Sequence, residues 1–149
     1  MFNQIAKFFG NTNPKVIQPY ALVVEDEELT SMIICQILKD HGYRVHAYKD
    51  GMDAINLTKN LDEDLVPNLI FIDLILPGAS GFSVLKAFRS VKMWKGVSMF
   101  LMTGNTDSSN VLKGFDCGAD AYLNKPLSRE KVVNIIKSSE RPIGKKIQL

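Results

Sequence analysis

The chain has 149 residues, of which 46% are hydrophobic and 23% charged, and its formal net charge is +2. This length and composition predict one globular domain with its own core and exclude a low-complexity chain. The positive charge lies at the two ends, so residues 20–139 are slightly acidic. That balance favours a bound cation and gives no support for nucleic-acid binding.

No apolar run approaches the ~18 residues that a membrane-spanning helix needs, so we expect no membrane partner. The N-terminus also lacks the apolar core and small-residue cleavage site of a secretory signal. The two cysteines, Cys35 and Cys117, fall in predicted helices without C-x-x-C spacing. They are therefore expected to be reduced and packed, which indicates a cytoplasmic location.

Residues 1–19 are predicted to lie outside the domain core as an N-terminal extension. Phe2, Ile5, Phe8 and Phe9 have a spacing that places them on one side of a short helix, which residues 11–14 would end. One interpretation is a loosely docked tail, because ten residues are too few for a stable isolated helix. The other is a small apolar face for a partner, for self-association or for the edge of a membrane.

The remaining chain alternates between apolar runs and helical patterns. In order, the sequence predicts a strand at 20–24, a helix at 28–41, a strand at 44–48, a helix capped by Asp50, a strand at 68–73, a helix capped by Ser80 and ending near 91, a strand at 97–102, a helix at 107–117, a strand at 119–123 and a helix at about 128–139. Residues 62–64 read as an acidic, solvated connection. Such alternation predicts an α/β domain at residues 20–139, a parallel sheet covered by helices on both faces, followed by a basic tail at 140–149.

Polar residues follow four of the predicted strands where each strand ends. Glu25 and Asp26 follow the first strand, Asp73 ends the third, Thr103 follows the fourth and Lys125 follows the fifth. The carboxyl ends of parallel strands lie on one edge of the sheet, which is where ligands bind in open α/β folds. We therefore expect these side chains to share one site.

Asp73 is the centre of this expected site. It ends the apolar run at residues 69–72, and Pro77 and Gly78 then start a loop, so its carboxylate should emerge at the sheet edge as a metal ligand or a nucleophile. Three crowded carboxylates repel one another, and a hard cation with oxygen ligands such as Mg²⁺ offsets that repulsion. A carboxylate beside a metal and the Lys125 ammonium is suited to in-line attack on phosphorus.

These residues carry a resemblance to a known family. The runs Val23-Val24-Glu25-Asp26-Glu27, Asp73 with Pro77 and Gly81, Thr103-Gly104 and Lys125-Pro126 resemble the receiver domain of bacterial two-component response regulators. The resemblance covers about residues 20–139. Within the family, the chain is similar to a single-domain, chemotaxis-regulator-like member. It implies a flavodoxin-like fold, with a five-stranded parallel sheet in the order 2-1-3-4-5 and helices on both faces.

The resemblance also implies a role for each site residue. Asp73 would accept a phosphoryl group from a histidine kinase or a histidine phosphotransfer protein. Mg²⁺ would be held by Asp73, by Asp26 directly, by Glu25 through water and by the backbone carbonyl of Ile75. The chain would then be a signalling domain rather than an enzyme, with only self-phosphorylation and self-dephosphorylation chemistry.

Further positions would form the switch. Thr103 and Lys125 would bind the phosphoryl group, Tyr122 matches the family's aromatic switch, and the peptide bond before Pro126 would be cis. Phosphorylation would change the binding of an unknown downstream protein on the face formed by residues 103–139. Of two positions that tune phosphoryl lifetime, Ile75 and Asn105, the apolar Ile75 predicts slow self-dephosphorylation.

Three other functions remain open at this stage. A pseudo-receiver would bind partners without phosphorylation, although the intact set of site residues argues against it. A phosphohydrolase with an aspartyl nucleophile often needs a second acid two residues later, where this chain has Ile75. A flavin carrier shares the fold but needs a Ser/Thr/Gly-rich phosphate loop after the first strand, which the sequence lacks.

Overall fold

The computed structural model describes residues 18–62, 65–104 and 108–139. The strands are β1 (Tyr20–Val24), β2 (Arg44–Tyr48), β3 (Leu69–Asp73), β4 (Ser98–Thr103) and β5 (Ala121–Asn124). The helices are α2 (Glu28–Asp40), α3 (Gly51–Leu57), α4 (Gly81–Arg89), α5 (Ser108–Asp116) and α6 (Arg129–Ser139), with a 3₁₀ turn η1 (Lys92–Trp94). The expected N-terminal extension (except residues 18–19) and basic tail, most of the acidic connection and Asn105 lie outside the described residues.

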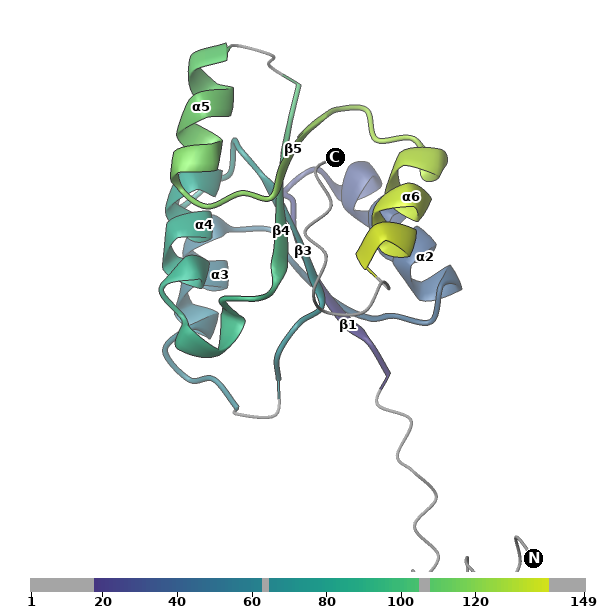
Figure 1. Ribbon diagram of the computed structural model, residues 1–149, viewed down its shortest axis with the longest axis horizontal. Helices are drawn as coiled ribbons and strands as arrows, with labels where there is room; N and C mark the ends of the chain where they lie inside the picture. Colours follow the sequence, from purple (N-terminus) through teal and green to yellow (C-terminus); the bar gives the residue numbers. More distant parts are fainter. Residues whose placement is uncertain (1–17, 63–64, 105–107, 140–149) are drawn as a thin grey trace, which may run out of the picture.

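The five strands form one parallel sheet in the order β2-β1-β3-β4-β5. The α/β class and the 2-1-3-4-5 order implied by the resemblance are therefore confirmed. Helices α3, α4 and α5 cover one face of the sheet, and α2 and α6 cover the other (Figure 1). Because β1 and β3 are neighbours, the direction of winding reverses between them, and the ends of these two strands lie side by side.

The central strand contributes alternately to two apolar cores, as the pleat of a strand requires. Ile70 and Ile72 pack in the core beneath α3 and α4, whereas Leu69 and Phe71 pack in the core beneath α2 and α6. All four side chains are completely buried. This burial on both faces explains why the sequence shows an uninterrupted apolar run, and it holds the following residue, Asp73, in a fixed position.

Helix starts follow the predicted capping residues. The Asp50 carboxylate accepts hydrogen bonds from the backbone N–H groups of Met52 and Asp53 at 2.7 and 3.1 Å. The Ser80 hydroxyl accepts from the backbone N–H of Ser83 at 3.2 Å. Both caps satisfy backbone donors that the first turn of a helix leaves unpaired, so the two predicted starts are confirmed.

Helix α4 ends earlier than its sequence pattern indicated. The expected helix reached about residue 91, but the regular turns stop at Arg89 and the chain tightens into η1. Trp94 in η1 is 1% exposed, and its ring meets the edge of the Phe88 ring at a centroid distance of 5.2 Å. Burying this large indole ring is the physical reason for the break, because a continued α-helix would place it elsewhere. Among the described residues, no helix combines the length and apolar character needed to cross a membrane.

Candidate functional site

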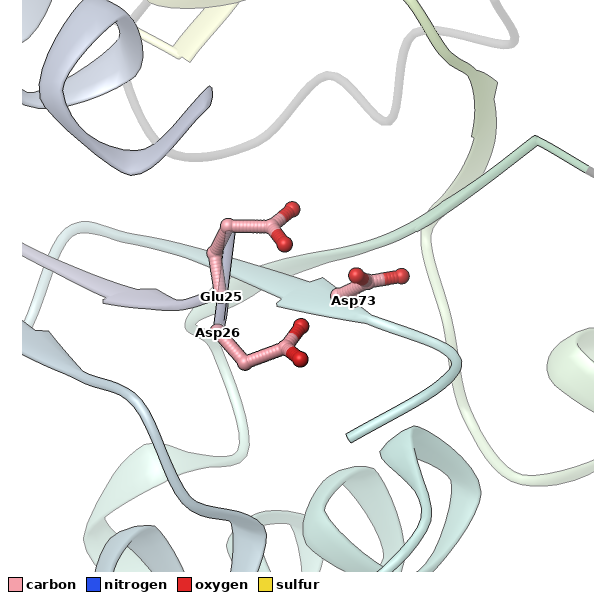
Figure 2. Close-up of side chains that lie close together, drawn as sticks. All are labelled: Glu25, Asp26 and Asp73. Carbon is pink, nitrogen blue, oxygen red and sulfur yellow. The ribbon is translucent and has the colours of Figure 1, made fainter. Parts of the chain in front are cut away.

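The residues predicted to meet at the carboxyl edge of the sheet do so. Asp73 is the last residue of β3, Glu25 and Asp26 directly follow β1, and the three carboxylates point toward a common space (Figure 2). One oxygen from each carboxylate lies within 4.8 Å of the other two. Asp26 is exposed to solvent, whereas Glu25 and Asp73 are 0% and 6% exposed.

Lys125 joins this cluster from the end of β5. Its ammonium Nζ lies 2.5 Å from Oε2 of Glu25 and 2.9 Å from Oδ2 of Asp73. One lysine therefore bridges carboxylates from two different strands, and its peptide bond to Pro126 is cis. A single ammonium offsets only part of the charge of three neighbouring carboxylates, so the site has an excess of negative charge.

Glu25 is the most strongly perturbed acid of the cluster. Burial raises the pKa of Glu25 from 4.5 to about 7, although the hydrogen bond from Lys125 partly opposes this change. Its Oε1 accepts a hydrogen bond from the backbone N–H of Glu27 at 3.1 Å. Burial lowers the pKa of Lys125, but the hydrogen bonds to Glu25 and Asp73 outweigh that effect and raise it overall. The lysine therefore stays protonated while the buried glutamate is held near its point of ionisation.

Asp73 is held by contacts to both of its oxygens. Oδ2 accepts from Lys125, and Oδ1 lies 3.4 Å from the backbone N–H of Ile75, a long hydrogen bond. The Ile75 side chain is 73% exposed beside the acid. Gly81, at the start of α4, approaches so closely that a β-carbon there would overlap the backbone carbonyl of Asp73. This close packing fixes the backbone of the acid from behind while its carboxylate remains at the sheet edge.

The donor set fits a hard divalent cation. All three side chains offer carboxylate oxygens, the ligands that Mg²⁺ prefers, and two of the three are buried where an uncompensated charge is costly. The buried Oε2 of Glu25 has an ion pair with Lys125 but no hydrogen bond of ordinary geometry. A cation in this space would offset the negative charge that Lys125 leaves uncompensated, so the acidic cluster is a candidate Mg²⁺ site.

Of the remaining predicted residues, Thr103 lies at the same edge, and Tyr122 lies two residues before the end of its strand. Thr103 is the last residue of β4 and is buried. Tyr122 lies on β5 and is half-buried against the core beneath α3 and α4. Its hydroxyl oxygen is buried and has no hydrogen-bond partner within the described part of the chain. An unpaired buried hydroxyl is costly to maintain, so this side chain would gain from a rearrangement that supplies a partner.

Sequence reasoning missed the support of the loop after β3. The backbone N–H of Gly51 donates to the carbonyl oxygen of Pro77 at 2.8 Å, and the Asp50 carboxylate lies against Gly78. The start of α3 therefore anchors the loop that contains Ile75. Asp50 carried a helix-cap signal in the sequence, but nothing in that signal indicates a second contact with a loop 28 residues further along the chain.

The arrangement defines a receiver-type domain, in which an acidic cluster and a lysine meet at the switch point of a five-stranded parallel sheet. The model of the response regulator receiver domain matches residues 21–137. This chain belongs to the family of response regulator receiver domains, the modules of two-component systems.

Known proteins similar to this chain support that assignment. The phosphate regulon transcriptional regulatory protein PhoB of Escherichia coli is 32% identical over 123 residues, which are 83% of this chain and 52% of PhoB. The chain thus spans about half the length of the curated relatives it matches.

Solved structures show the same fold. A response regulator receiver domain protein (CheY-like) from Methanospirillum hungatei is 25% identical, with a TM-score of 0.72 over 81% of this chain and 92% of that one. The receiver domain of a sensor histidine kinase from Pseudomonas aeruginosa is 26% identical, with a TM-score of 0.70 over 81% of this chain and 96% of that one. The latter structure has a magnesium ion coordinated in its active-site cleft.

Proposed function

We propose that Asp73 accepts a phosphoryl group from the phosphohistidine of a histidine kinase or a histidine phosphotransfer protein, in a reaction that needs Mg²⁺. The observation that carries this proposal is the position of the Lys125 ammonium, which contacts Asp73 at 2.9 Å inside the acidic cluster. An Asp73 oxygen forms the new bond to phosphorus, the phosphorus–nitrogen bond of the donor breaks, and the departing imidazole keeps the nitrogen electron pair and takes up a proton. This self-phosphorylation, with its reversal by water, is the only chemistry proposed for the chain.

The site residues have different roles in this transfer. Glu25, Asp26, Asp73 and the carbonyl of Ile75 would hold Mg²⁺, which would supply positive charge for the phosphoryl oxygens. Lys125 supplies a second, fixed positive charge, and the raised pKa of Lys125 keeps it protonated. Because Asp73 is buried, its carboxylate can be reached only from the open edge of the sheet, so the donor must approach from there.

Phosphorylation would then act as a switch. The phosphoryl group turns one negative charge into nearly two and offers new acceptors to Lys125 and to the hydroxyl of Thr103. We propose that Thr103 moves toward these oxygens and that Tyr122, whose hydroxyl is buried without a partner among the described residues, rearranges with it. The face of residues 103–139 would thereby bind a downstream protein in one state only.

We also propose that the receiver unit spans residues 20–139 and acts in the cytoplasm, where its unpaired Cys35 and Cys117 would stay reduced. Residues 1–19 and 140–149 would flank this unit as an N-terminal extension and a basic tail. Neither flank is needed for the site, because every site residue lies within the unit.

The phosphoryl group is expected to persist. Ile75 is 73% exposed next to Asp73 and presents only carbon to a water molecule that approaches the phosphorus. No group there can orient or activate such a water, so self-dephosphorylation should be slow. The check is the lifetime of the phosphorylated protein with Mg²⁺, and a half-life of seconds would contradict the prediction. Ile75→Asp, which introduces a carboxylate at the same place, should shorten the lifetime.

The decisive experiment is phosphorylation by a small phosphodonor, read by intact mass. With Mg²⁺, the wild-type chain should gain the mass of one phosphoryl group, and Asp73→Asn should gain none. Asp40→Asn is the matched control, because Asp40 is an exposed carboxylate in an ion pair with Arg129 and should not affect labelling. Equal labelling of Asp73→Asn would overturn the proposal. A wild-type chain that binds neither Mg²⁺ nor beryllofluoride would instead be a pseudo-receiver.

A further inference from the structure

Helix α2 carries an apolar surface that the described residues leave uncovered. Leu29, Met32 and Ile33 are 65%, 61% and 47% exposed. Their spacing of three and four residues makes them neighbours on one side of the helix. Isolated exposed apolar residues are ordinary on protein surfaces, but contiguous ones are typical of a surface that binds another apolar group. We call these three residues the α2 apolar face.

We propose that residues 2–9 of the same chain dock on the α2 apolar face. This segment contains Phe2, Ile5, Phe8 and Phe9, whose spacing gathers four large apolar side chains on one side of a helix. A segment this short does not form a stable helix alone in water. Packing against an apolar surface would stabilise it, and the α2 apolar face is of matching chemistry.

The connecting chain is long enough for this contact. Residues 10–17 link the segment to Gln18, which lies just before β1, and eight extended residues span at most about 26–29 Å. The α2 apolar face lies near the far end of β1, because α2 begins after β1 ends and runs back alongside it (Figure 1). The five residues of β1 cover about 17 Å, and the link must also cross from β1 to the outer side of α2, so it reaches this face in an extended conformation.

Charge complements the apolar contact. Residues 1–17 contain Lys7 and Lys15 and no acidic residue. The exposed carboxylates of Asp26, Glu27 and Glu28 directly precede Leu29 at the start of α2. A basic, apolar segment laid on this end of α2 would meet three carboxylates at its edge, whereas the exposed apolar residues of α5 have one base, Lys113, and one acid, Asp116, beside them. This difference favours α2 over α5 as the docking surface.

The test is nuclear magnetic resonance of the full chain, labelled with ¹⁵N and at the methionine methyl groups. Docking predicts a nuclear Overhauser effect between the rings of Phe8 or Phe9 and the Met32 methyl group. Phe8→Asp should abolish it and move the amide signals of the α2 apolar face, and Met32→Asp should in turn move the signals of residues 2–9. Met32 is exposed and Phe8 lies outside the receiver unit at residues 20–139, so the dispersed signals of the sheet should remain.

The matched control is Leu112→Asp, because Leu112 on α5 is 66% exposed and as apolar as Leu29. It should leave the signals of residues 2–9 unchanged. The proposal is overturned if Phe8→Asp leaves α2 unaffected, or if Leu112→Asp and Met32→Asp move residues 2–9 equally. It is also overturned if the contacts vanish on dilution, because the segment would then dock on a second copy.

Discussion

The two edges of the sheet use the same kinds of charged group in opposite ways. At the amino edge, the Arg89 guanidinium donates to the carbonyl oxygens of Gly118 and Val97, each at 2.8 Å, and to the carboxylate of Asp120 at 2.7 Å. The same Asp120 oxygen accepts from the backbone N–H of Met99 at 2.8 Å. At the carboxyl edge, one ammonium contacts two carboxylates, and a third carboxylate lies beside them.

The two edges differ in the way that a structural ion pair differs from a reactive site. The amino edge balances one cation with one carboxylate and uses the remaining donors on backbone oxygens, so no charge is left over. The carboxyl edge gathers more negative than positive charge in a largely buried space. Burial first, and the neighbouring Asp73 carboxylate second, raise the pKa of Glu25 to about 7. Stability is therefore concentrated at one edge, and binding capacity at the other.

The largest expected effect on stability is at the amino edge. Arg89→Ala should lower the free energy of unfolding by roughly 3 kcal/mol, because it removes charge-assisted hydrogen bonds and leaves the carbonyl groups of Gly118 and Val97 unpaired. Mg²⁺ affinity, measured by isothermal titration, should not change. The control is Arg129→Ala, whose ion pair with Asp40 is exposed, so its loss in urea denaturation should be far smaller than that of Arg89→Ala. Equal losses would show that the amino edge has no special role.

The next largest effect is expected at Gly81, where one substitution should lower both the free energy of unfolding and the Mg²⁺ affinity. Gly81→Ala should cost about 2 kcal/mol, because the added methyl group overlaps the carbonyl of Asp73 and forces α4 or the end of β3 to shift. The shift moves the acid, so Mg²⁺ affinity should fall as well. Gly42→Ala is the matched control: its φ of +86° costs about 1 kcal/mol, but the space around it is open and far from the site. Unchanged Mg²⁺ affinity in Gly81→Ala would contradict this reasoning.

At the carboxyl edge, neutralising a charge should stabilise the chain. Glu25→Gln should raise the free energy of unfolding of the metal-free protein by about 1 kcal/mol at pH 8, because it removes a buried carboxylate that burial disfavours. The same change should weaken Mg²⁺ binding roughly 10- to 100-fold, the usual effect of losing a group that supports a metal site. Destabilisation of the metal-free variant would show instead that the pair with Lys125 dominates.

The smallest effect is the pH dependence of the difference in free energy of unfolding between Glu25→Gln and the wild-type chain. The pKa of Glu25 is about 7 in the folded chain against 4.5 as its ordinary value, so the folded chain binds the additional proton between these pH values. This contribution to stability is fully present below pH 4.5 and is lost as the pH rises through 7. The advantage of Glu25→Gln should therefore shrink to less than ~0.5 kcal/mol at pH 4.5. Urea denaturation in a chelator at pH 4.5 and pH 8 measures it, and an advantage independent of pH would rule out this titration.

Much of the fold could be predicted from the sequence because burial on two faces leaves a plain signal. β1 and β3 are uninterrupted apolar runs, and their ends were placed within one residue. The strand expected at 119–123 begins two residues later, at Ala121, and extends to Asn124. The reason is local: the backbone N–H of Ala119 closes α5 on Gly114, and the Asp120 carboxylate turns toward Arg89.

The sequence could predict which residues form the site, but not which contacts they make with one another. Strand ends of a parallel sheet must share an edge, so Asp26, Asp73 and Lys125 could be grouped without any structure, although the strand order came from the resemblance. The bridge from Lys125 to Glu25 and the clamp of Arg89 could not be found in this way. Both join residues far apart in the chain through single contacts, which leave no periodic pattern in a sequence.

The position of β3 has a mechanical consequence. It lies between β1 and β4 and is buried on both sides, so it has little room to move. A chemical event on its last residue cannot be relayed by bending the strand itself. The disturbance must instead travel outward through the segments that follow the strands at this edge. Because β3 is held on both faces, any structural response to a change at Asp73 is confined to the carboxyl edge of the sheet.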